Sequence, residues 1–230
     1  MIRVLVGVPT SEMARRAAFY DHYHSLQLPM GTMATFAHGQ SIAHNRNIIV
    51  KQALENGCSH IFFIDDDIVL PPDILIQLIC HNVDSVSALM LMRDYPHKPL
   101  IFKSFDDNGG AEHIFMDDPD VQTNSLIPIA ASGLGCCLIK TKVFSKLEEP
   151  FFRFGEVDLD GLSEDLGFFR RVQKLGLQHW CDLNATVGHM TNVNVWPKRI
   201  EGGWVTSYEN NNGLVNFPTI QRPRVETDGS

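Results

Sequence analysis

Four consecutive apolar residues at 61–64, Ile-Phe-Phe-Ile, constrain the fold more than any other feature of the sequence. Neighbouring side chains of a β-strand point to opposite faces, so a strand of this composition is buried on both sides. Helices must then cover both faces of its sheet. Helical and strand-like segments alternate along the chain, which favours parallel strands joined by helices. We therefore predict an α/β fold with a mostly parallel sheet flanked by helices, in which ligands bind beyond the carboxyl ends of the strands.

Local patterns give the expected order of elements. Apolar and β-branched runs predict strands at 3–8, 32–37, 61–64, 83–91, 127–131, 134–140, 179–181 and 185–189. Helices are expected at about 12–26 after a Thr10 or Ser11 cap, between Ile42 and Gly57, at 71–80, and between Ser163 and Gly176. Residues 93–125 are expected to be irregular, with a turn at 106–110. We expect one catalytic domain over 1–195 and a loop-rich tail over 196–230, because the tail is rich in Asn, Gly and Pro.

The composition excludes several classes of protein. The chain has 230 residues with 19 Lys and Arg against 27 Asp and Glu, a formal charge of −8, so it has no general attraction for nucleic acid or anionic lipid. No apolar run approaches the roughly 20 residues that span a bilayer, and the first residues turn polar too soon for a secretory signal. The five cysteines form no CxxC pair, and adjacent Cys136 and Cys137 point to opposite faces of a strand, which disfavours disulfides or a zinc site. We expect a reduced, cytoplasmic protein with no transmembrane segment.

Three acids, Asp65, Asp66 and Asp67, follow the buried strand directly. Carboxylates packed this closely repel one another and raise each other's pKa. A divalent cation removes that penalty, and carboxylate oxygens suit Mg²⁺ or Mn²⁺, which commonly bridge to substrate phosphates. If the strand geometry continues, Asp65 and Asp67 share one side and Asp66 takes the other. The alternative is a solvated turn whose acids favour the next helix N-terminus; the strand before and the Pro-Pro helix start after favour the metal and phosphate site.

The segment IFFIDDDIVLPPDIL resembles the DxD region of GT-A fold glycosyltransferases, especially family 2-like enzymes. The likeness extends as an ordered series of motifs from Arg3 to about His189. It implies a GT-A-like (Rossmann-like) fold and a metal ion on the diphosphate of a nucleotide-sugar donor. On this resemblance Asp65 lies near the ribose or the metal, and Asp66 or Asp67 is the main metal ligand. The triplet leaves their division of roles open.

A second motif, Asn45-Arg46-Asn47, lies on a predicted helix. Arg46 falls on the apolar stripe shared with Ile42 and Ile49, where a guanidinium is costly unless it is paired or faces a ligand. The resemblance implies that Arg46 and Asn47 lie close to the diphosphate or sugar of the donor. The other interpretation is that Arg46 pairs with an acid of the triplet and supports the structure. The two interpretations are compatible.

Two motifs near the end of the predicted domain carry titratable groups. Glu164 and Asp165 open the helix after Ser163, where acids favour the first turn whatever the function. The resemblance implies that they form the "ED" pair of the family, whose carboxylate is the general base in inverting members, with Asp165 ahead of Glu164. A lone histidine such as His189 is more often structural, but the resemblance implies that it completes the metal shell, as in many retaining members. The stereochemical outcome therefore stays open.

A glycine-rich turn and the end of the first strand supply the remaining candidates. Gly133, in Ser132-Gly133-Leu134-Gly135, either lets a ligand approach the backbone closely or forms a tight strand connection. The resemblance places this turn beside the donor sugar and the acceptor, and it places Pro9 and Thr10 at the nucleotide base. The acid that is common in the family after the second strand is missing here. The base, uridine or guanosine, therefore stays open.

These motifs predict a metal-dependent glycosyltransferase that uses Mn²⁺ or Mg²⁺ and a UDP- or GDP-linked nucleotide-sugar donor. Its acceptor is an unidentified hydroxyl of a glycan, a small molecule or a modified nucleic-acid base. A nucleotidyltransferase that makes a sugar nucleotide is the first alternative, disfavoured because Pro9-Thr10-Ser11-Glu12 stands where such enzymes carry a Gly-rich basic loop. A non-catalytic sugar-nucleotide-binding module is the second. The joint presence of carboxylates and a histidine argues against it, and these residues are Asp65, Asp67, Asp165 and His189.

Overall fold

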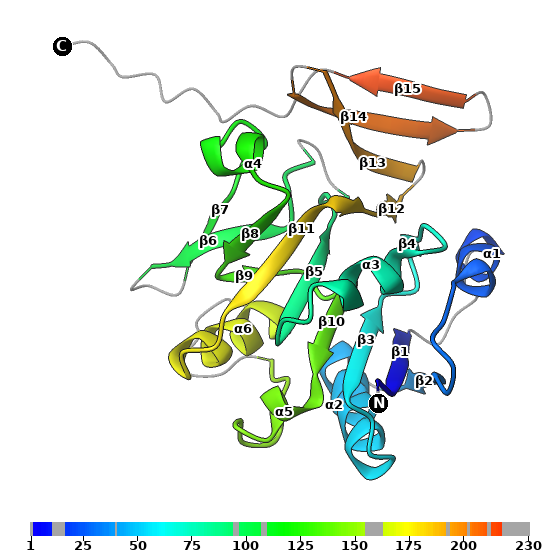
Figure 1. The fold of residues 1–230 in the computed structure, drawn as a ribbon, viewed down its shortest axis with the longest axis vertical. Coiled ribbons are helices and arrows are strands. Elements are labelled where there is room, and N and C mark those ends of the chain that lie inside the picture. Colours follow the sequence, from blue (N-terminus) through cyan, green and yellow to red (C-terminus); the bar gives the residue numbers. More distant parts are fainter. Residues whose placement is uncertain are drawn as a thin grey trace.

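The structure is a computed structural model that describes residues 2–10, 17–39, 41–93, 97–106, 110–154, 163–191, 194–201, 203–210 and 213–217. A seven-stranded sheet forms its centre, and two smaller sheets adjoin it (Figure 1). The strands of the central sheet are β1 (Val4–Thr10), β2 (Met33–His38), β3 (His60–Ile64), β5 (Ser85–Leu89), β8 (Leu126–Ile129), β10 (Cys136–Lys140) and β11 (His179–Thr186). The helices are α1 (Ala17–Ser25), α2 (Ile42–Glu55), α3 (Ile74–Cys80), α4 (Pro119–Thr123), α5 (Thr141–Phe144) and α6 (Glu164–Lys174).

The central sheet is mostly parallel, as predicted. Its strand order is β2-β1-β3-β10-β5-β11-β8. The strands β2, β1, β3, β5 and β11 run in one direction, while β10 and β8 run against them. The carboxyl ends of β1, β3 and β5 therefore meet at one edge of the sheet, where the segments that follow them come together.

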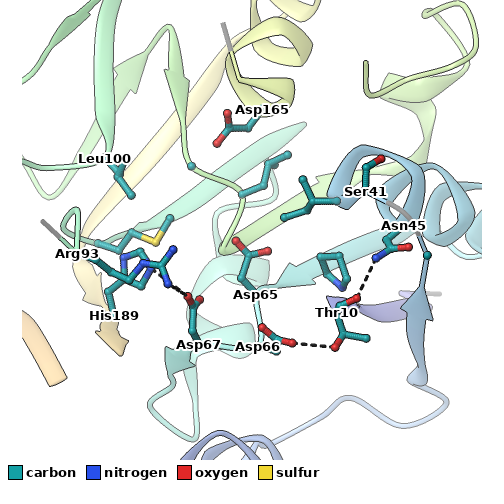
Figure 2. Close-up of a pocket in the computed structure, with 16 residues that line it drawn as sticks. Thr10, Ser41, Asn45, Asp65, Asp66, Asp67, Arg93, Leu100, Asp165 and His189 are labelled. Atoms are coloured by element: carbon teal, nitrogen blue, oxygen red, sulfur yellow. Dashed lines mark hydrogen bonds and ion pairs between the residues drawn. The ribbon is translucent and has the colours of Figure 1, made fainter. Parts of the chain in front are cut away.

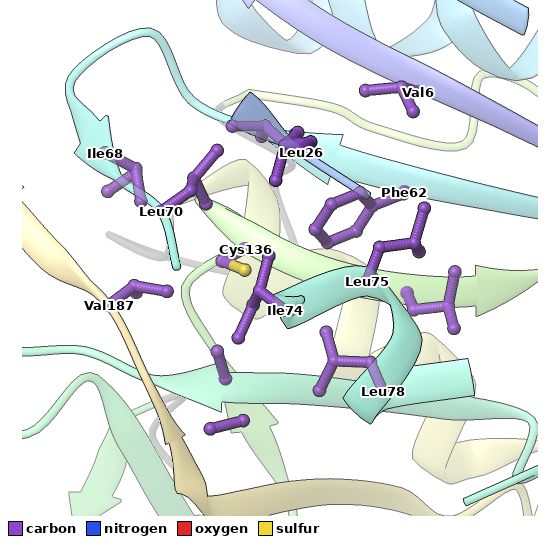
Figure 3. Close-up of a cluster of buried hydrophobic side chains, with 14 of the residues drawn as sticks. Val6, Leu26, Phe62, Ile68, Leu70, Ile74, Leu75, Leu78, Cys136 and Val187 are labelled. Atoms are coloured by element: carbon purple, nitrogen blue, oxygen red, sulfur yellow. The ribbon is translucent and has the colours of Figure 1, made fainter. Parts of the chain in front are cut away.

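Helices cover both faces of the central sheet, which confirms the prediction from the apolar run at 61–64. Phe62 and Ile64 of β3 pack into a core with α1 and α3 (Figure 3), whereas Ile61 and Phe63 pack into a second core with α2, α5 and α6. Cys136 and Cys137 divide in the same way between the two cores. Burying each large apolar side chain contributes about 1.5–3 kcal/mol, so this alternation fixes the register of the strands.

A five-stranded antiparallel sheet adjoins the central one and corrects the expectation of a loop-rich tail. It comprises β4 (Ile68–Val69), β12 (Gly188–Met190), β13 (Asn194–Ile200), β14 (Gly203–Asn210) and β15 (Gly213–Phe217), in the order β15-β14-β13-β12-β4. Alternate side chains of β13 and β14, such as Val195 and Trp204, are buried, a pattern that the Gly, Asn and Pro content concealed. Residues 218–230 of the expected tail lie outside the described residues.

The segment expected to be irregular also contains regular structure. A three-stranded sheet in the order β7-β6-β9 is formed by β6 (Ile101–Phe105), β7 (Ala111–His113) and β9 (Ala131–Ser132). The turn expected at 106–110 falls between β6 and β7, and its residues 107–109 lie outside the described residues; on either side of them, the Asp106 backbone N–H donates to Gly110 O at 2.9 Å. The expected helix cap at Thr10 or Ser11 and the helix start at 12 involve residues 11–16, which lie outside the described residues. Within the described part of the chain, no helix combines the length and hydropathy of a membrane-spanning helix.

Candidate functional site

A pocket of about 470 Å³ lies at the edge of the central sheet where β1, β3 and β5 end (Figure 2). Thr10 ends β1, the three acids follow β3, and Met90 and Arg93 follow β5. This is the place where ligands bind in sheets of parallel strands. The candidates that line the pocket are Pro9, Thr10, Asp65, Asp66, Asp67, Gly133, Asp165 and His189. Arg46, Asn47 and Glu164 are not among the lining residues.

The three acids spread in different directions, because the strand ends at Ile64 and a turn follows. The backbone N–H of Ile68 donates to Asp65 O at 3.2 Å. Asp66 Oδ2 accepts a hydrogen bond from Thr10 Oγ1 at 2.8 Å, and Asp67 points towards Arg93 (Figure 2). Each carboxylate therefore has its own partner, and the alternation predicted from continued strand geometry does not describe them.

Asp65 is held from behind the pocket by Arg46. Arg46 is 1 % exposed, and its Nη2 donates to Asp65 Oδ1 at 2.9 Å while Nη1 donates to Glu164 Oε1. Burial alone lowers the pKa of Arg46, but the negative charges of Asp65, Glu164 and Asp165 outweigh it and raise that pKa above its usual value. Pairing with an acid of the triplet is thus the interpretation of Arg46 that the structure supports. One guanidinium faces two carboxylates here, so a further cation on the pocket side would stabilise ionised Asp65.

His189 reaches the acids through the adjoining sheet. β12 pairs with β4, which places His189 opposite Ile68, and the Met190 N–H donates to Asp67 O at 2.7 Å. Nδ1 of His189 lies 2.8 Å from Leu91 O, and because a carbonyl only accepts, Nδ1 carries the proton. In neutral His189 the lone pair is therefore on Nε2, which lies 3.5 Å from Asp67 Oδ2. A backbone carbonyl that fixes this tautomer is a common support for a metal-binding histidine.

Asp67 is the carboxylate most strongly stabilised as an anion. Its Oδ2 lies 2.8 Å from Arg93 Nη1, and the same oxygen faces His189. Burial raises the pKa of Asp67. A proton on His189 Nε2, which makes that ring a cation able to donate to Asp67, and the charge of Arg93 together outweigh burial and lower the pKa below its usual value. Asp67 thus stays ionised and presents its charge at the pocket.

The two acids of helix α6 face different surroundings. Glu164 is 6 % exposed and forms an ion pair with Arg46. Asp165 lines the pocket, and Figure 2 shows it extending from α6 above Asp65. Ser163 Oγ and the Leu166 N–H both donate to Asp165 Oδ1, whereas no described residue donates to Oδ2. Of the two acids, Asp165 is the one that can reach a ligand.

Gly133 borders the pocket beside Met90. A Cβ at this position would lie 2.6 Å from Met90 Cε, so glycine keeps that wall open. The adjacent Ser132 Oγ donates to Gly133 O at 2.9 Å and lies 2.9 Å from Nε2 of buried His179. Nδ1 of His179 lies 2.8 Å from Ser85 Oγ. Because the Ser132 proton is used on Gly133 O, Nε2–H donates to Ser132 and Ser85 donates to Nδ1, which completes a buried chain behind the glycine turn.

The other end of the pocket carries uncharged polar groups, with Asp66 beside them. Pro9 and Thr10 lie there with Ser41 and Asn45 (Figure 2). Asn45 Nδ2 donates to Thr10 O at 3.0 Å, and buried Asn45 Oδ1 has no partner among the described residues. Asn47 lies elsewhere: its amide donates to Phe152 O at 2.8 Å and accepts from the Phe152 N–H at 3.0 Å. Asn47 therefore fixes a neighbouring loop, and the structure does not bring it to the pocket.

The predicted metal ligands are only partly assembled. Among the described residues, no group of three or more His, Cys, Asp or Glu side chains is arranged to hold a metal ion. Asp67 and His189 converge, whereas Asp65 is engaged by Arg46. Mg²⁺ and Mn²⁺ are often held by one or two protein ligands and completed by water and substrate phosphates. Asp67 with His189 fits that kind of site and does not fit a metal enclosed by protein alone.

Sequence reasoning missed Arg93, Met90 and Leu100 as lining residues. The position of Arg93 could have been found, since it stands two residues after the strand predicted at 83–91 and the strand-end rule applies to it as to Asp65. Leu100 could not, because its approach depends on the pairing of Leu91 with Pro99. Asn45 belongs to a motif already noted, but only the structure shows its buried, unpaired oxygen.

Comparison with known proteins bears on the fold. No family model and no curated protein sequence matches the chain. The crystal structure of A197 from STIV is similar in fold, with a TM-score of 0.60 over 98 % of this chain and 100 % of that one. The identity is 13 %. At that identity the likeness shows a shared α/β fold, and it carries no information about activity.

Proposed function

We propose that this chain is a metal-dependent glycosyltransferase with a GT-A-like fold, which moves a sugar from a UDP- or GDP-linked donor to a hydroxyl acceptor. The observation that carries the proposal is the convergence of Asp67 and His189 at a pocket where strands β1, β3 and β5 end. Asp165 faces the same pocket from α6.

The charges around the pocket support the metal. Four of the lining residues are Asp, and Arg93 is the one Lys or Arg among the described residues that line it. An anionic diphosphate would be repelled by such a surface. A divalent cation held by Asp67 and His189 would offset part of this negative charge and would supply a positive partner for the phosphate groups. When bound, it would act as a Lewis acid on the departing diphosphate.

The residues of the chain would divide the remaining work. Arg46 keeps Asp65 in place, while Thr10 and Asn45 would offer hydrogen-bonding groups beside Asp66 for the nucleoside. Gly133 leaves room for the sugar. Asp165 holds one oxygen on its own helix and presents the other to an acceptor hydroxyl, whose proton it would accept if the enzyme inverts.

A donor panel tests the proposal. UDP-, GDP- and other nucleotide sugars are each combined with Mn²⁺, Mg²⁺ or EDTA, and thermal shift and release of free nucleotide are measured. We expect a metal-dependent shift with one donor class, and its loss in Asp67→Asn. The control is Asp73→Asn, which removes the same charge at an exposed helix cap where the side chain makes no capping bond. Donor binding that is equal in Asp67→Asn and wild type contradicts the metal assignment.

Adding nucleoside triphosphates to this panel separates the alternatives. A thermal shift with nucleoside triphosphates, with pyrophosphate released, would identify a nucleotidyltransferase. Tight donor binding without hydrolysis or transfer would identify a binding module. No shift with any ligand or metal would leave the acids as a solvated turn.

A further inference from the structure

Arg93 occupies the side of Asp67 that a cation would take. Its Nη1 lies 2.8 Å from Asp67 Oδ2, the oxygen that also faces His189 Nε2 at 3.5 Å. One carboxylate oxygen is thus shared between a guanidinium and an imidazole. A divalent cation bound by Asp67 and His189 would compete with Arg93 for that oxygen.

The two arginines near the acids are held very differently. The side chain of Arg46 is 2 % exposed and is paired with two carboxylates. The side chain of Arg93 is 54 % exposed, and its one ion pair within the described chain is with Asp67. Water can solvate the half-exposed guanidinium of Arg93 when it leaves Asp67, whereas the buried guanidinium of Arg46 would lose both of its partners without reaching water.

We propose that Arg93 is a phosphate-binding residue of the pocket, which exchanges Asp67 for an anionic ligand group when a divalent cation binds that carboxylate. The inference rests on the proposed function for the identity of the ligand, a nucleoside diphosphate. A guanidinium that is freed next to a metal site is suited to phosphate, because its planar donors match two phosphate oxygens. The cation and the phosphate group then bind cooperatively, since the first releases the residue that receives the second.

The exchange has opposite consequences for the two ligands, and this makes it testable. Without Arg93, Mn²⁺ meets no competitor at Asp67 and binds about two- to five-fold more tightly. A nucleoside diphosphate loses a charge-assisted hydrogen bond and binds about tenfold more weakly. A residue with only a structural role would not move the two affinities in opposite directions.

The experiment is titration calorimetry on the wild type and Arg93→Gln. Mn²⁺ is titrated alone, and UDP and GDP are titrated in saturating Mn²⁺. Lys98→Gln is the matched control, because it removes the same charge from the same loop and Lys98 does not line the pocket. We expect Arg93→Gln to tighten Mn²⁺ and weaken the nucleotide, with both affinities unchanged in the control.

The outcomes separate this inference from the proposed function. If UDP or GDP binds with Mn²⁺ equally well to Arg93→Gln and wild type, the inference is overturned and the proposed function stands. If neither nucleotide binds wild type, inorganic pyrophosphate is titrated in their place. Mn²⁺-dependent pyrophosphate binding that needs Arg93 then upholds the inference and removes the nucleotide-sugar donor. Mn²⁺ that binds Arg93→Gln no more tightly than wild type overturns the inference in either case.

Discussion

His179 offers a quantitative test of the hydrogen-bond chain behind the glycine turn. Its side chain is buried at 2 % exposure between Ser85 and Ser132, and burial lowers its pKa from 6.5 to about 3. Between these two pH values the unfolded chain binds a proton at this imidazole and the folded chain does not, so the free energy of unfolding falls as the pH falls. With about 1.4 kcal/mol per pKa unit, this residue alone lowers it by about 2 kcal/mol between roughly pH 7.5 and pH 5.

The perturbation is His179→Gln, which removes the titration and retains an amide able to bond to Ser85 and Ser132. Urea unfolding of both proteins is followed by circular dichroism across this pH range. Subtracting the free energy of unfolding of the variant from that of the wild type at each pH cancels the contributions of the titratable groups that both proteins share. We expect the stability advantage of the wild type to shrink by about 2 kcal/mol towards pH 5.

A difference that stays constant with pH refutes the reasoning, because it means that His179 titrates alike in the folded and unfolded chains. If the variant does not fold, the wild type suffices. The His179 Cε1–H resonance in the NMR spectrum of the folded protein should then show no titration over the same range, and a normal titration there refutes the reasoning equally.

Two further substitutions test the site. Arg46→Met leaves buried Glu164 and partly buried Asp65 without their partner, so the free energy of unfolding should fall by about 3–5 kcal/mol in urea titrations. Lys51→Met, which breaks an exposed pair on the same helix, should cost under about 1 kcal/mol, and similar losses for both would contradict the buried network. Gly133→Ala puts a methyl 2.6 Å from flexible Met90, so nucleotide binding measured by calorimetry should weaken about tenfold with little loss of stability. Gly57→Ala adds its methyl at a φ of 62° with no neighbour near it, so it should lower stability and leave nucleotide binding unchanged. Weakened binding in this variant would contradict the assignment of Gly133.

The core of the fold was predictable because its signals are local. The apolar residues at 61–64 indicate burial on both faces, and the structure distributes them between two cores. The additional sheets were not predictable in the same way. β4 is only two residues long and exists because β12 pairs with it, and β12 comes from 120 residues further along the chain. A strand of two residues is too short to show the alternation of apolar and polar residues that predicts a strand.

The same distinction between local and tertiary signals applies to the candidate site. The acids after β3 and the position of Asp165 at a helix start could be recognised from neighbouring residues. The pairing of acids with bases could not be recognised, because Arg46 meets both Asp65 and Glu164 only once the helices have packed on the sheet. The separation of Glu164 from the pocket and the direction of Asp67 towards Arg93 are tertiary results of this kind.

The pairing of β12 with β4 also determines the order in which parts of the pocket can form during synthesis. Residues 65–69 leave the ribosome early, but the strand that carries His189 is made more than a hundred residues later. The N-terminal half can form its parallel strands and bury Asp65 against Arg46 while synthesis continues. A nascent chain therefore holds its acids before it holds the imidazole that faces them. The His189 side of the pocket can therefore form only after β12 has been made.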